Sequence, residues 1–446
     1  MKEMRHTYIT FGLGKFSFRV WLAPDTFAAN AWTLMYASFV TIGFLTLVNA
    51  GQAYVLNENL GVPRSEQGTI TGNLAVLSEI VGILLIWPIG ILSDRIGRRP
   101  VFVFGLIVMG ISFAFYPLVD SVQQITYARF IYSIGTAVST GMLGTVIQDY
   151  PREDSRGKMI AGAGVFNALG VIFVAFVIAS LAARFVSFGI EPIAAGRYMH
   201  WIVTVILFVS ALVLIKGLKG GTPAKKEDRP PLRDLMIAGF RHLHNPRISL
   251  SYASAFVGRS DLVITGTFVI LWCTLSGIEQ GMTTGAAVAR AGALFGTIQI
   301  VALLWTPILG LIIDRFNRTS AVVFGMFVAS IGYSSMYFVD NPLDPKYLPL
   351  FIILGIGQVS AFLSSQALIG QEAPLKERGS VVGMFGMFGA VGILITTLVG
   401  GILFDEWMRS GPFVFVGCIN FLVFLWGALV RVKWPGPMPE RTQVHV

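Results

Sequence analysis

Long apolar runs separated by short polar segments dominate this chain. The runs cover residues 32–56, 68–92, 100–119, 124–148, 159–184 and 199–216, and then 249–275, 286–312, 319–339, 346–370, 379–404 and 411–430. The hydrocarbon core of a bilayer is crossed by roughly 20 mainly apolar residues in a helix. The pattern therefore predicts an all-α polytopic membrane protein with twelve transmembrane helices.

A polar, basic segment divides the runs into two sets of six. It covers residues 217–248 and contains the helix-breaking pair Pro230-Pro231. The predicted organisation is an N-terminal tail, an N-terminal six-helix half, a linker, a C-terminal six-helix half and a C-terminal tail, at residues 1–31, 32–216, 217–248, 249–430 and 431–446. In the first tail, Phe16 to Trp21 is expected either to lie along the membrane interface as an amphipathic segment or to be flexible.

The two sets repeat one another in sequence. Asp94-Arg95 recurs as Asp314-Arg315, and at the same spacing Val103-Phe104-Gly105 recurs as Val323-Phe324-Gly325. Small residues recur as well: Ala161, Gly164, Asn167 and Gly170 correspond to Gly383, Gly386, Gly389 and Gly392. A fixed spacing over several positions indicates duplication, and two parallel repeats favour a transporter whose halves rock about a central site. The small residues themselves are expected to serve helix packing.

Charge and composition agree with a membrane protein. The chain is 54% hydrophobic and only 13% charged, and its mean hydropathy is +0.71. The net charge of +9 does not indicate a nucleic-acid partner, because most Lys and Arg lie in the tails and in loops on one side. The opposite loops hold Arg64, Arg184, Arg197, Arg290, Lys346 and Arg409. This positive-inside bias predicts that both termini are cytoplasmic.

The sequence lacks the residue patterns that a primary pump or a metal-dependent enzyme would need. The chain contains no phosphate-binding G-x-x-x-x-G-K-[ST] loop, which argues against a primary pump. Its five histidines and its carboxylates do not cluster with metal-ligand spacing in any span. Cys273 and Cys418 both sit in apolar runs and are interpreted as packing residues. We therefore expect neither a cofactor nor an enzyme.

The loop between the second and third runs reads GILSDRIGRR, from Gly90 to Arg99. It resembles the signature loop of the major facilitator superfamily, G-x-x-x-D-R-x-G-R-R. The second-half copy, GLIIDRFNR, is similar but has Asn317 where the first copy has Gly97. The resemblance implies a secondary transporter of the bacterial inner membrane that works as a monomer by alternating access. Its expected partners are a small-molecule solute, protons or another coupling ion, and the lipid bilayer.

The loop also has a physical interpretation. Gly90 and Gly97 are expected to permit tight turns, and Asp94 lies near the start of the third helix, where an anion is favoured. The neighbouring arginines can pair with acidic groups such as Asp149. By family resemblance, such contacts form in one access state and break in the other. The expected gate residues are Gly90, Asp94, Arg95, Gly97, Arg98, Asp149, Arg156, Asp314, Arg315 and Arg318.

Ionisable groups at membrane depth are candidates for function because they are costly there. Arg259 and Asp261 lie in the middle of the seventh run, Glu79 in the second and Arg129 in the fourth. Two residues apart on a helix, Arg259 and Asp261 should point to different sides. The superfamily lines its central cavity with helices one, four, seven and ten. The candidates for contact with solute or protons are Arg259, Asp261, Glu79, Arg129, Asn49 and Gln52.

Arg259 is the candidate for holding an anionic group, since its planar guanidinium matches carboxylate or phosphate. Asp261 or Glu79 is the candidate for carrying the coupling proton. The alternative for these groups is a structural ion pair between helices. At the level of function, the alternatives are a drug or metabolite efflux antiporter and a non-transporting receptor or scaffold with the same fold. The glycine pattern of drug antiporters is absent from residues 159–184, and the direction of transport stays open.

Overall fold

The computed structural model describes residues 7–11, 18–152, 155–221, 240–374 and 377–436. Within them, twelve helices are long and apolar enough to cross a membrane. This confirms the predicted all-α class with twelve transmembrane helices. Most of the predicted linker and the last residues of the C-terminal tail lie outside the described residues.

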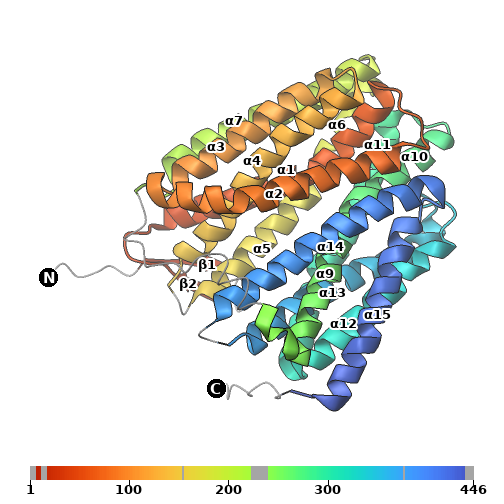
Figure 1. Cartoon of the computed structure of the whole chain (residues 1–446). Helices are drawn as coiled ribbons and strands as arrows, with labels where there is room; N and C mark the ends of the chain where they lie inside the picture. Colours follow the sequence, from red (N-terminus) through yellow and green to blue (C-terminus); the bar gives the residue numbers. More distant parts are fainter. Residues whose placement is uncertain (1–6, 12–17, 153–154, 222–239, 375–376, 437–446) are drawn as a thin grey trace. The chain divides into compact units, whose positions relative to one another are not determined.

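Backbone groups cannot be left unpaired in lipid, so each apolar run closes its hydrogen bonds as a helix. In the first set these helices are α1 (Ala28–Glu58), α2 (Gln67–Ile96), α3 (Arg98–Phe115), α4 (Val122–Asp149), α5 (Arg156–Phe173) with its continuation α6 (Leu181–Ser187), and α7 (Pro192–Gly217). In the second set they are α9 (Pro246–Ile264) with its continuation α10 (Ile270–Glu279), α11 (Thr284–Arg315), α12 (Arg318–Ser334), α13 (Leu348–Glu372), α14 (Arg378–Glu406) and α15 (Gly411–Lys433). Figure 1 labels these elements.

Among the described residues, two spans contain a π-helical turn. Val174–Ile178 joins α5 to α6, and Thr265–Val269 joins α9 to α10. Such turns leave backbone groups without their usual partner and occur often at functional sites. The second of them directly follows the segment that carries Arg259 and Asp261.

The helices form two compact units. One comprises Met1–Val62, Leu77–Lys225 and Gly277–Gly296, and the other comprises Pro63–Val76, Lys226–Ser276 and Thr297–Val446. In the first unit α1 packs on α5 and α7, and α3 packs on α4 and α7. In the second unit α9 packs correspondingly on α14 and α15, and α12 on α13 and α15. The same pairings thus occur in both units, in agreement with the repeat in the sequence.

Glycines allow the closest of these contacts. A Cβ added at Gly170 on α5 would lie 2.1 Å from the carbonyl oxygen of Phe39 on α1. A Cβ at Gly392 on α14 would lie 2.0 Å from that of Phe256 on α9. The two glycines are equivalent in the repeat, so packing of backbone against backbone accounts for this part of the small-residue stripe.

The N-terminal segment is a β-hairpin. Strand β1 (Tyr8–Phe11) pairs antiparallel with β2 (Phe18–Trp21). Val20 is fully buried, and the backbone N–H of Trp21 donates to Ser155 Oγ over 3.1 Å. Phe18–Trp21 is therefore a paired strand, which disagrees with the flexible alternative, while its placement along the membrane interface stays a prediction.

Candidate functional site

The Asp94 loop, residues Gly90–Arg99, is the first copy of the charged motif and comprises the last turns of α2, the linking residue Gly97 and the first residues of α3. Arg98, the first residue of α3, donates from Nη1 to Asp94 Oδ1 over 2.7 Å and from Nε to Asp149 Oδ2 over 3.1 Å. Asp149 ends α4, so one guanidinium ties the ends of three helices. The pairing of a loop arginine with Asp149 is thus present, and Arg95 is exposed on the same loop.

The two glycines of this loop differ in what surrounds them. Gly97 has a φ of 98°, and an added Cβ would lie 2.6 Å from the carbonyl oxygen of Gly221. Gly90 lies inside α2, and an added Cβ there would meet no atom of the described residues within 4 Å. The expectation that Gly90 permits a tight turn was wrong, because the turn begins only after Ile96. Gly97 does fill that role.

This difference gives a prediction for stability. Gly97→Ala should lower the free energy of unfolding by about 1–3 kcal/mol, because alanine is strained at positive φ and meets the Gly221 carbonyl. Gly90→Ala is the matched control: it should leave stability unchanged or raise it by about 0.5–1 kcal/mol, since alanine is favoured inside a helix. Thermal unfolding of the purified variants measures both. Equal melting temperatures for the two variants would contradict the assignment.

The second copy of the motif is built differently. Asn317, which replaces the glycine, is the N-cap of α12: its φ is −57°, and its side chain accepts a hydrogen bond from the Thr319 N–H. An N-cap asparagine satisfies a free helix N–H, so no positive φ is needed here. Arg318 donates to the Ile313 carbonyl over 2.7 Å, and Arg315 is exposed. The side chain of Asp314 lies outside the described residues.

The loop before α14 carries a further ionic contact. Glu377 pairs with His242 and Arg241. The hydrogen bond from His242, followed by the attraction of Arg241, holds the pKa of the Glu377 carboxyl below its usual range. The contact therefore strengthens the fold above the unfolded pKa of Glu377 and is lost as the pH falls through the folded value. In the first unit, Arg156 begins α5 and is exposed.

The Arg129 cluster lies inside the first unit. Arg129 on α4 is only 6% exposed. Its Nε donates to Ser78 Oγ on α2 over 2.8 Å, and its guanidinium lies 5.1 Å from the ring centre of Tyr132. Its Nη1 is 3.5 Å from Gln52 Oε1 on α1, which also accepts from the Tyr116 hydroxyl. Arg129 and Gln52, both predicted site residues, are brought together here. Two other predicted site residues, Asn49 on α1 and Glu79 on α2, are half-buried.

Arg259 and Asp261 point to different sides of α9, as their spacing predicted. The stem of Arg259 passes across Gly389 on α14, and its Nη1 donates to the Gly386 carbonyl over 3.2 Å. Asp261 faces α15 instead, where Asn420 Nδ2 donates to its Oδ1 over 2.9 Å. As expected from their spacing, these two described residues do not pair with each other.

The Asp261 cluster consists of Asp261, Asn420, Tyr333 and Thr265, all of them buried. The Tyr333 hydroxyl on α12 donates to the Asp261 backbone carbonyl over 2.6 Å and lies 2.7 Å from Thr265 Oγ1 in the π turn. In the part of the chain that the structure describes, Asp261 Oδ2 has no hydrogen-bond partner. The cluster thus holds a carboxyl group where three helices meet, and its Oδ2 accepts no hydrogen bond from the described residues.

Sequence reasoning missed three members of this cluster, Asn420, Tyr333 and Thr265. Asn420 is an amide within an apolar run, and Tyr333 is an aromatic residue near the end of another. The isolated amide was a usable signal, because a polar side chain in a membrane helix commonly bonds to another helix. Gln358 and Gln299 illustrate the rule, with a hydrogen bond of 2.9 Å between α13 and α11.

Comparison with known proteins places this architecture in a family. The family model described as Major Facilitator Superfamily matches residues 34–348 and 283–444. The chain belongs to the Major Facilitator Superfamily. Transporters of this superfamily are embedded in membranes and bind small-molecule solutes, so the twelve spans are those of an integral membrane protein. The motif resemblance that carried the sequence prediction is thereby confirmed.

Individual relatives give a narrower context for this superfamily member. It is 29% identical to the magnetosome protein MamH of Paramagnetospirillum magneticum, over 87% of this chain and 90% of MamH. It is 24% identical to the magnetosome protein MamZ of the same organism over 91% of this chain, but it spans only 63% of MamZ. Among solved structures, the nucleoside transporter NupG matches with a TM-score of 0.69 and 14% identity, over 91% of this chain and 99% of NupG. That likeness concerns the fold.

Proposed function

We propose that this protein is a secondary active transporter that moves a small organic solute with an anionic group, coupled to protons, by alternating access. One observation supports an anionic group on the solute. The Arg259 guanidinium sits near the middle of the 34-residue span Pro246–Glu279, and among the described residues its single hydrogen-bond partner is the Gly386 carbonyl. A cation kept at membrane depth without a carboxylate is a functional candidate.

The contacts and planar shape of the Arg259 side chain narrow the chemical class of the solute. Its contact with Gly389 fixes the aliphatic stem against α14, and Nη1 is the atom bonded to Gly386. The other guanidinium N–H groups remain for a ligand. Their planar fork suits a carboxylate or phosphate bound through two parallel hydrogen bonds. A carboxylated or phosphorylated metabolite is the class of solute that this geometry favours.

Asp261 is our candidate for the coupling group. Its carboxyl group has one oxygen held by Asn420 and the other unbonded among the described residues. A proton can be bound and released at Oδ2 without loss of the Asn420 hydrogen bond. The half-buried carboxylate Glu79 is the second candidate for this role.

Three further elements complete the proposal. Arg129, held by Ser78, together with Asn49 and Gln52, would contribute polar contacts to the solute or proton. The Asp94 loop would act as a gate, with the Arg98–Asp149 contact made in one access state and broken in the other. The gate assignment extends to Arg95, Arg156, Asp314, Arg315 and Arg318 on resemblance alone.

We infer from the distribution of Lys and Arg that both termini are cytoplasmic, and the location that we propose is a bacterial plasma membrane. The relative MamH is a magnetosome protein, so a magnetosome membrane is a second location worth testing. Immunoblotting of separated plasma-membrane and magnetosome fractions from the source cells distinguishes the two.

The experiment that tests the proposed solute is a thermal-shift screen. The purified protein is heated with a library of small metabolites, and a ligand that binds the folded state at 100 times its Kd stabilises by about 2.7 kcal/mol. We expect hits among carboxylated or phosphorylated compounds, and no shift with the same compounds for Arg259→Ala. Hits confined to uncharged or cationic compounds would contradict an anionic solute, and shifts retained in Arg259→Ala would remove Arg259 from the site.

A further inference from the structure

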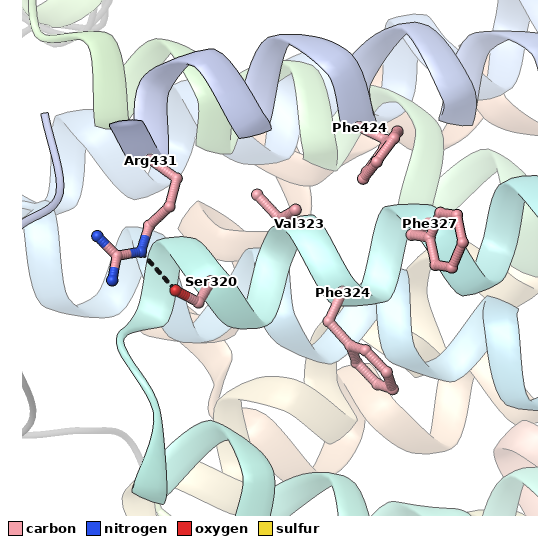
Figure 2. A pocket seen from close by; sticks show the side chains of 6 residues that line it. All are labelled: Ser320, Val323, Phe324, Phe327, Phe424 and Arg431. Atoms are coloured by element: carbon pink, nitrogen blue, oxygen red, sulfur yellow. Dashed lines mark hydrogen bonds between the residues drawn. The ribbon is translucent and has the colours of Figure 1, made fainter. Parts of the chain in front are cut away.

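A groove runs along the surface between α12 and α15, both in the second unit. Its volume is about 320 Å³. The lining residues are Ser320, Val323, Phe324 and Phe327 from α12 and Phe424 and Arg431 from α15. Figure 2 shows three phenylalanine rings along one part and Arg431 at one end. The four α12 residues follow a helical i, i+3, i+4, i+7 spacing, so they form one stripe of that helix.

Among the described residues that line this groove, Arg431 alone is charged, and its orientation is set by a neighbour. Its Nε donates to Ser320 Oγ over 2.5 Å. In Figure 2 the two terminal nitrogens of the guanidinium point away from Ser320. Within the described residues these two nitrogens have no protein partner. The groove therefore presents two free N–H₂ groups beside an aromatic surface.

The position of the groove in the membrane is unusual for a solute site. Arg431 lies in the last turn of α15, and Ser320 in the first turn of α12. These helix ends carry Arg318 and Lys433 as well, so the positive-inside rule assigns them to the cytoplasmic interface. From Ser320 to Phe327 the apolar stripe extends about 10 Å toward the bilayer core, at 1.5 Å per residue.

We propose that the groove binds one anionic phospholipid of the cytoplasmic leaflet. Its phosphate accepts hydrogen bonds from the terminal nitrogens of Arg431, and one acyl chain lies along Phe324, Phe327 and Phe424. The charge of Arg431 complements an anionic headgroup at the depth where headgroups lie, and the apolar walls complement a chain. Basic pockets between transmembrane helices on this side are suited to such lipids. A free phosphate ion would use the arginine but leave the apolar walls in contact with lipid.

Native mass spectrometry of the full, delipidated protein in detergent tests this site. The probes are phosphatidylglycerol, phosphatidylcholine with the same acyl chains, and inorganic phosphate. We expect phosphatidylglycerol to bind more tightly than phosphatidylcholine, and inorganic phosphate neither to bind nor to compete. Arg431→Gln should weaken phosphatidylglycerol about fivefold, the effect of one basic residue at a membrane surface. Lys433→Gln is the matched control, since this exposed lysine is two residues away and does not line the groove.

A second variant guards against misfolding of Arg431→Gln. Ser320→Ala keeps the charge but frees Nε, so it should weaken phosphatidylglycerol less than Arg431→Gln does. Equal affinity of wild type and Arg431→Gln for phosphatidylglycerol overturns the proposal, as does equal weakening by Lys433→Gln, which would indicate diffuse surface attraction. Displacement of the lipid by inorganic phosphate would show that the site takes a free anion instead.

Discussion

Arg259→Gln is expected to abolish concentrative transport of an anionic solute while leaving the protein folded. Losing the charged partner of a buried anion costs about 2–5 kcal/mol, which corresponds to a loss of affinity of roughly 30-fold or more. Arg259 makes one hydrogen bond among the described residues, to the Gly386 carbonyl, and the glutamine keeps the first part of the stem that packs against Gly389. Its melting temperature should therefore change little.

The measurement is uptake of labelled solute into proteoliposomes, using a ligand found by the thermal-shift screen. Arg259→Lys should retain part of the activity, because an ammonium keeps the charge but not the planar fork. Arg290→Gln is the matched control, since Arg290 is an exposed cation on α11 and its loss should leave uptake unchanged. Wild-type uptake by Arg259→Gln would refute the site.

Asp261→Asn should uncouple transport from the proton gradient. Asparagine has the same size and still offers a carbonyl oxygen to Asn420 Nδ2, which donates over 2.9 Å in the wild type. The variant should thus fold, but it has no carboxyl group to carry a proton. We expect accumulation driven by a pH gradient to disappear, while exchange of labelled for unlabelled solute at equal pH continues.

Two companion variants isolate the carboxyl group. Tyr333→Phe removes a hydroxyl that donates to the Asp261 backbone carbonyl without altering the carboxyl, so pH-driven accumulation should persist. Asp261→Ala removes one of the two hydrogen bonds that Asn420 Nδ2 donates, the other going to the Val416 carbonyl over 3.2 Å, and leaves a buried N–H without its acceptor, which should cost about 1–3 kcal/mol of stability in addition to the loss of coupling. If Asp261→Asn still accumulates solute against its gradient, Asp261 is not the coupling group, and Glu79 becomes the residue to test.

Local sequence predicted the parts of this protein that the bilayer dictates. Each apolar run had to become a helix, and the residue spacing on α9 was enough to separate Arg259 from Asp261. The charged loop could be located, and its tie to Asp149 anticipated, because both lie at the same membrane face. The gate role of that loop and the solute and proton roles of Arg259, Asp261, Glu79 and Arg129 remain predictions.

The sequence-based expectations failed at residues whose surroundings are made by segments distant in the sequence. Gly97 needs to be glycine because the Gly221 carbonyl lies against it, whereas Gly90 has open space around it. Nothing in the local pattern separates the two. The hairpin of Tyr8–Phe11 and Phe18–Trp21 was missed for a related reason, because strand pairing and burial against Ser155 are contacts at long range.

The sequence by itself determined the twelve helices, the duplication and the superfamily, since these follow from hydropathy, spacing and a contiguous motif. Only the tertiary structure decided which atoms meet the buried charges. Asn420 is 159 residues from Asp261, and Gly386 is 127 residues from Arg259. The physical reason is that a buried polar group is satisfied by whatever helix packs beside it. Packing partners are set by the fold of the whole unit rather than by neighbouring residues.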